Sequence, residues 1–80
     1  MGMKLWGYPK PRDNAAVDLS EVTLVASPAQ LRKIAAFLVQ AAEGIEKHGK
    51  GWEHEHLADQ VPGFRSSPQF IVFNSQHFKK

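Results

Sequence analysis

Eighty residues provide enough apolar surface for one hydrophobic core, so we expect a single domain over residues 1–80. The lack of cysteine excludes disulfides and thiolate metal ligands, and it suits a protein of the cytoplasm. Ten basic residues are scattered among eight acidic ones, and the resulting net charge of +2 argues against a nucleic-acid partner. The sequence shows neither a signal-peptide pattern nor an apolar run long enough to cross a bilayer, so we expect no membrane partner.

The first two expected elements are β-strands. Residues 3–8 alternate in character and include Trp6 and Tyr8, which favours a first strand. Residues 9–14 contain two prolines and an Asp-Asn pair and are typical of a loop. Residues 19–26 are rich in β-branched side chains and predict a second strand, with Val22 and Leu24 on one side and Glu21 on the other.

Residues 27–49 predict one long helix with a clear beginning and end. Ser27 and Gln30 have the spacing of a capping box, Pro28 suits the first helical position, and Gly49 suits a left-handed C-terminal cap. At 1.5 Å per residue the helix would be about 30 Å long. Apolar residues spaced by three and four predict one buried stripe, made of Leu31, Ile34, Ala35, Leu38, Ala41, Ala42 and Ile45 and flanked by Phe37.

Two further strands are expected after the helix. Residues 52–57 alternate ring side chains with carboxylates, and residues 70–73 form a compact apolar run closed by Asn74. The segment between them, residues 58–68, contains two prolines and predicts an irregular connection that Val61 and Phe64 could anchor. Residues 76–80 predict a flexible tail.

The resulting order is β-β-α-β-β, which predicts an α+β fold of the two-layer sandwich type. In this fold one long amphipathic helix packs on a mostly antiparallel four-stranded sheet.

His54 and His56 are the residues that most suggest chemistry. Two residues apart on a strand, they would point the same way and could share a metal, although the sequence does not place a third ligand beside them. The alternative is that both rings and Trp52 turn toward the helix while Glu53 and Glu55 take the open face. The sequence contains no nucleophile elbow, zinc-binding helix motif or phosphate loop, so we expect no enzyme, no catalytic residue, no bound metal and no cofactor.

The sheet face opposite the helix is the candidate for protein binding. One helix covers one side of a sheet, yet both faces of the outer strands carry large apolar side chains, and exposed aromatic patches often mark protein contacts. The candidate contact residues are Trp6, Tyr8, Glu21, Glu53, Glu55 and Phe73. Loops could instead cover this face, and a homodimer would use the same surface.

Several short stretches of the sequence resemble one known family. These are Gly7-Tyr8, Ser20-Glu21-Val22, ASPAQLRKIAAFL over residues 26–38, EHEHL over residues 53–57 and FIVFN over residues 70–74. Together they resemble the immunity protein 32 family, small bacterial α+β proteins of polymorphic toxin systems.

The resemblance implies a protein that binds and neutralises a cognate toxin without catalysis or cofactor. Glu21, His54 and His56 match the family pattern at positions that a core alone would not demand. The alternatives are a small metal-binding or pH-responsive domain that uses the two histidines, or a weak nucleic-acid-binding domain.

Overall fold

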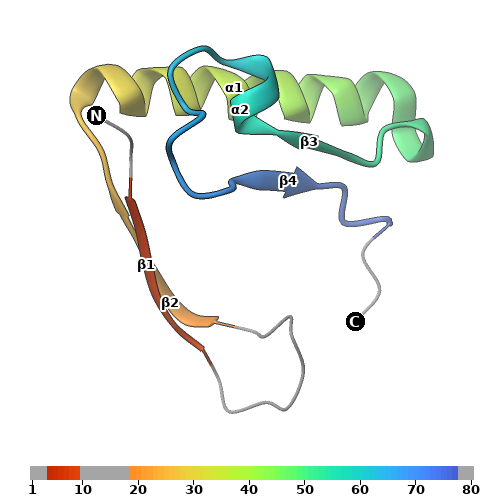
Figure 1. The fold of residues 1–80 in the computed structure, drawn as a ribbon. Helices are drawn as coiled ribbons and strands as arrows, with labels where there is room; N and C mark the ends of the chain where they lie inside the picture. Colours follow the sequence, from red (N-terminus) through yellow and green to blue (C-terminus); the bar gives the residue numbers. More distant parts are fainter. Residues whose placement is uncertain (1–3, 10–18, 78–80) are drawn as a thin grey trace.

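The computed structural model describes residues 4–9 and 19–77, and of residues 4, 5, 7, 8 and 9 it describes the backbone only. The elements follow the predicted order with two short additions, the 3-10 helix η1 and the one-turn helix α2 (Figure 1). Along the chain they are β1 (Lys4–Pro9), β2 (Leu19–Val25), α1 (Pro28–His48), η1 (Gly49–Gly51), β3 (His54–His56), α2 (Leu57–Gln60) and β4 (Ile71–Phe73). The α+β class and the single long helix are therefore confirmed.

Helix α1 begins and ends where its sequence signals indicate. The backbone N–H of Gln30 donates to Ser27 Oγ at 3.2 Å, and the Gln30 side-chain oxygen accepts from the Ser27 N–H at 2.9 Å. Both halves of the predicted capping box are thus present. At the other end Gly49 has a φ of 54°, which favours glycine, and its N–H donates to the Ile45 carbonyl.

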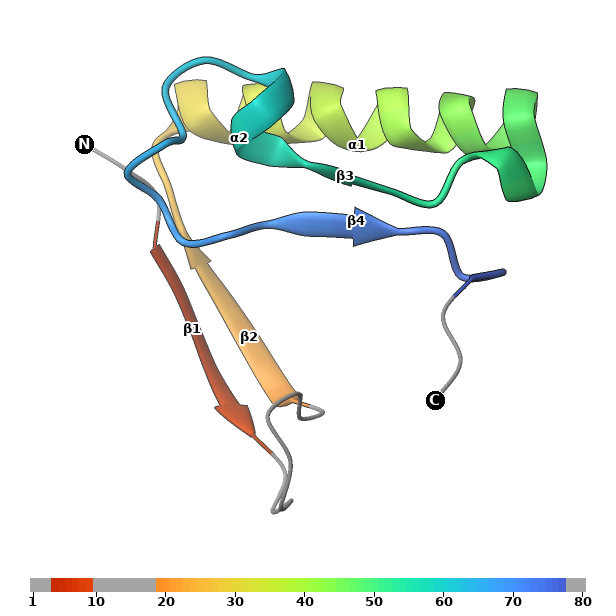
Figure 2. The same ribbon diagram turned by 45° about the vertical axis from the view of Figure 1, so that its right-hand side comes forward.

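The prediction of one four-stranded sheet was wrong. β1 pairs with β2, and β3 pairs with β4, each pair antiparallel and each forming its own two-stranded sheet. Strands β3 and β4 are only three residues long, because Leu57 opens α2 directly after β3 and Asn74 ends β4. The β1–β2 hairpin swings away from β4 instead of extending its edge, as both views show (Figures 1 and 2).

The core lies between α1, α2 and the segment that leads to β4. Its buried cluster is Ile34, Phe37, Leu57 and Phe64, and partly buried Val61 and Val72 pack against it. The predicted anchoring of the 58–68 connection by Val61 and Phe64 is thereby confirmed, although that connection begins with the α2 turn. The Leu57 N–H donates to the Phe70 carbonyl at 2.9 Å, which joins α2 to the start of β4.

Only a minority of the predicted stripe on α1 is buried. Ile34, Phe37 and Ala41 are buried, whereas Leu31 and Leu38 are exposed, Leu38 by 43%. The expectation that Leu38 belongs to the core was wrong. The physical reason is that β3 and α2 lie over the Phe37 side of the helix, and the missing four-stranded sheet leaves the adjoining side uncovered.

No helix in the described part of the chain combines the length and the apolar character needed to cross a membrane.

Candidate protein-binding face

The two faces of the β3–β4 pair carry different residues. His54 lies opposite Phe73 and His56 opposite Ile71, so these four side chains share one face, and Glu55 and Val72 share the other. Val72 packs against the core, and Glu55 lines a pocket with Phe37 and other α1 residues. The face of His54, His56, Ile71 and Phe73, called the histidine face below, is therefore turned away from the helix.

The expectation that both histidines turn toward the helix while Glu55 takes the open face was therefore wrong. Trp52 does lie against α1, but it comes before the first residue of β3. The face on which Trp52 lies therefore does not predict the face on which His54 and His56 lie. Within β3 it is Glu55 that points to the helix side.

Rings gather on the histidine face. The His54 ring stacks on Phe73 with centroids 5.3 Å apart and an angle of 10° between the ring planes. His56 meets His54 edge to face, also at 5.3 Å. Ile71 and Phe73 nevertheless remain 44% and 41% exposed. The face is thus an ordered apolar surface with solvent on one side.

Polar partners hold both histidine rings in place. His54 Nδ1 lies 3.3 Å from a carboxylate oxygen of Glu53, whose side chain is 58% exposed at the rim of the face. His56 Nδ1 lies 3.1 Å from the Gln69 side-chain oxygen. This contact is a hydrogen bond for the His56 tautomer that carries its ring proton on Nδ1. Each ring therefore already uses one nitrogen within the protein.

Asn74 fixes the end of β4 and was not singled out for any role by sequence reasoning. Its side chain is almost completely buried, and its amide nitrogen donates to the carbonyls of Gly49 at 3.1 Å and Trp52 at 2.8 Å. Its oxygen accepts from the Gln76 N–H at 3.0 Å. Asn74 thus ties the histidine face to the end of α1, and its place directly after an apolar run was the only signal in the sequence.

A pocket of about 120 Å³ lies on the helix side of β3. It is lined by Phe37, Gln40, Ala41, Trp52, Glu55 and Gln60. Trp52 packs closely on α1 at Gly44, where an added Cβ would come within 2.6 Å of the indole nitrogen. Glu55 therefore lies inside this recess, away from Glu53 and Phe73, and is set apart from the other candidate contact residues.

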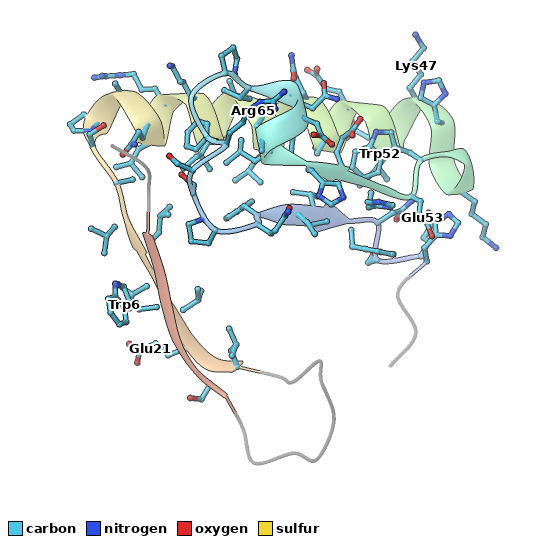
Figure 3. The ribbon with its side chains drawn as sticks, viewed as in Figure 1. Trp6, Glu21, Lys47, Trp52, Glu53 and Arg65 are labelled. Carbon is cyan, nitrogen blue, oxygen red and sulfur yellow. The ribbon has the colours of Figure 1, made fainter. Side chains whose placement is uncertain are left out.

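The remaining candidates lie on the β1–β2 hairpin (Figure 3). Trp6 pairs with Thr23 and is 63% exposed, and Glu21 pairs with Tyr8. The side chain of Tyr8 lies outside the described residues. Figure 3 shows Trp6 and Glu21 close together on the hairpin and Glu53 far from both. The six candidates therefore occupy three places, namely the hairpin, the histidine face with its rim, and the pocket.

Among the residues that the structure describes, no group of three or more His, Asp or Glu side chains could hold a metal ion. His54 and His56 alone supply two ligands, whereas a structural zinc site takes four.

Comparison with known families gives a match. The sequence model of immunity protein 32 matches residues 21–76. The chain belongs to the immunity protein 32 family. The match runs from β2 through α1, β3 and α2 to the turn after β4, so it includes the histidine face and Asn74 and leaves out β1 with Trp6 and Tyr8. No curated protein and no solved structure matches this chain.

Proposed function

We propose that this immunity protein 32 family member binds a cognate protein toxin in the cytoplasm and neutralises it by contact, without catalysis or cofactor. Family membership supports a toxin-neutralising role in general. The observation that carries the choice of surface is the histidine face, where Ile71 and Phe73 stay exposed although both belong to a strand within the family match.

The face has the composition of an interface centre. Its middle is apolar and aromatic, and aromatic side chains in a well-packed interface often contribute 2 kcal/mol or more on truncation, about thirtyfold in affinity. Glu53 adds an exposed carboxylate at the rim. Rim charges mainly change the association rate, so Glu53 would favour a partner with a basic patch.

The face is also preorganised, which lowers the entropic cost of binding. His54 stacks on Phe73, Gln69 holds His56, and Asn74 anchors β4 to the loop after α1. A partner would therefore meet side chains whose positions are already set by contacts within the protein.

The experiment uses the toxin encoded next to this chain's gene as the probe and measures affinity by calorimetry. Phe73→Ala should weaken binding about thirtyfold or more. Trp6→Ala is the matched control, because it removes an exposed aromatic from the hairpin, and it should change affinity by less than about threefold. Loss of binding in Trp6→Ala with full binding in Phe73→Ala would contradict the proposal and move the site to the hairpin.

A second pair of variants tests the rim. Glu53→Gln should slow association and reduce its dependence on salt, whereas Glu43→Gln, an exposed carboxylate on α1, should leave both unchanged. Equal effects of the two variants would show that net charge matters and the position of Glu53 does not.

A further inference from the structure

The pocket on the helix side of β3 combines one carboxylate with an indole ring and two side-chain amides. Its lining residues come from α1, β3, α2 and the connection at Trp52, and its volume is about 120 Å³. Phe37 and Ala41 are buried, so they form its inner wall. Gln40 and Gln60 are exposed, so they lie at its mouth. The pocket is therefore apolar at its base and polar at its opening.

Glu55 is the one charged side chain among the described residues that line the pocket. It is half-buried, and its carboxylate forms no hydrogen bond or ion pair with any residue in the described ranges. Lys33 and Lys47 lie seven residues before and after Gln40, so they share its side of α1, yet neither lines the pocket. A half-buried carboxylate loses part of its hydration, and a cation with hydrogen-bond donors compensates for that loss. The pocket therefore suits a positively charged group.

Trp52 and the two amides indicate which cation fits best. The indole of Trp52 is held against α1 at Gly44, where an added Cβ would lie 2.6 Å from the indole nitrogen. Tryptophan attracts cations more strongly than the other aromatic residues do, and a guanidinium also stacks on its ring. The side-chain oxygens of Gln40 and Gln60 can accept hydrogen bonds beside the Glu55 carboxylate. A guanidinium has several donors in one plane and is less strongly hydrated than an ammonium, so arginine matches these groups better than lysine does.

The size of the pocket limits how much of an arginine can enter. A cavity of about 150 Å³ in a protein core holds one benzene molecule. The pocket is smaller than that, so it has room for a guanidinium, which is smaller than benzene, but not for a whole arginine. The backbone of the arginine stays outside the mouth, which favours an arginine carried on a peptide segment over the free amino acid.

We propose that this pocket binds the guanidinium of an arginine on a peptide segment of a partner protein. Glu55 pairs with the guanidinium, Trp52 stacks on it, and the amide oxygens of Gln40 and Gln60 accept from its outer donors. Glu55 and the histidine face lie on opposite faces of the β3–β4 pair, so the arginine does not compete for the histidine face. The proposal does not depend on toxin binding, and each of the two can fail without the other.

Titration of the full chain with N-acetyl-argininamide tests the pocket directly. The chain has two tryptophans, so the indole N–H resonance of Trp52 reports on the pocket and that of Trp6, on the hairpin, is the control in the same spectrum. The Trp52 resonance should shift along a saturable curve in the millimolar range, since so small a group makes few contacts, and the Trp6 resonance should not move. The citrulline counterpart has nearly the same shape without the charge and should bind about tenfold more weakly or worse. The lysine counterpart should bind at least about threefold more weakly.

Two matched variants test the role of the carboxylate. Glu55→Gln keeps the shape of the side chain and should weaken binding about tenfold or more. Glu46→Gln removes the same charge from an exposed position nine residues after Phe37, on the opposite side of α1, and should bind like the parent. The absence of a saturable Trp52 shift would overturn the proposal, and so would parent-like binding by Glu55→Gln. Equal binding of the citrulline or the lysine compound would also overturn it, and this comparison uses the parent chain, so it holds even if Glu55→Gln does not fold.

Discussion

Replacing Asn74 by Ala should cost this small protein a large part of its stability. The side chain makes three hydrogen bonds, to Gly49, Trp52 and Gln76, from a position with 1% exposure. An internal hydrogen bond contributes about 1 kcal/mol net, and a buried group left without a partner costs about 1–3 kcal/mol. Gly49 and Trp52 are half-buried, so water can reach part of this region. We therefore expect a loss of about 2–4 kcal/mol.

Urea unfolding followed by far-UV circular dichroism measures this loss. For a domain of 60–100 residues, each kcal/mol lowers the thermal midpoint by about 4–8 °C, so Asn74→Ala should lower it by roughly 10–30 °C. Ser75→Ala is the control, because Ser75 is the exposed neighbour and should change stability by less than about 0.5 kcal/mol.

Asn74→Asp separates the hydrogen bonds from the packing. Aspartate has the same shape as asparagine, but at neutral pH it would place an acceptor where the amide nitrogen now donates to two carbonyls. We expect this variant to be at least as unstable as Asn74→Ala. Parent-like stability of Asn74→Asp would refute the reasoning, because it would show that donation to Gly49 and Trp52 does not hold the end of β4.

Three further predictions concern the core, the helix contact and the histidine pair. In urea unfolding, Phe37→Ala should lower the free energy of unfolding by about 3–5 kcal/mol, because it removes a buried side chain and leaves a cavity. Phe73→Ala, at an exposed position, should lower it by less than about 1.5 kcal/mol. Similar losses in the two variants would contradict the assignment of faces. Gly44→Ala should lower the free energy of unfolding by about 1–3 kcal/mol, although alanine has the better helix propensity, because the new Cβ displaces the indole of Trp52. The displaced indole should also shift the tryptophan fluorescence. Zinc titration followed on the imidazole resonances should show no saturable binding at micromolar concentration, and such binding lost in His54→Ala would prove this wrong.

The helix could be predicted from the sequence almost to the residue, because its signals are local. A capping box involves residues three apart, Pro28 fixes its own backbone angle, and Gly49 supplies a positive φ, so none of these depends on a distant partner. The hairpin and β4 follow from alternation and short apolar runs for the same reason, and the resemblance to the family rested on these same segments.

The candidate site was only partly predictable. Alternation in residues 52–57 separates His54 and His56 from Glu55, but it does not say which set faces the helix, and that depends on where β3 meets α1. The way Asn74 joins β4 to the end of α1 could not be predicted, because the two carbonyls that its amide nitrogen contacts, those of Trp52 and Gly49, lie 22 and 25 residues earlier in the chain.

The sequence by itself determined where the helix and strands form, since backbone conformation responds to neighbours within a few residues. Tertiary structure alone decided that the strands form two sheets instead of one, that Ile34 and Phe37 are buried while Leu38 is not, and that Phe73 lies open beside His54. An apolar stripe on a helix, or alternation along a strand, predicts which side chains share a face. Whether that face is covered depends on the position of distant segments, and in this chain short β3 and β4 strands and the outward hairpin leave much of the apolar surface uncovered.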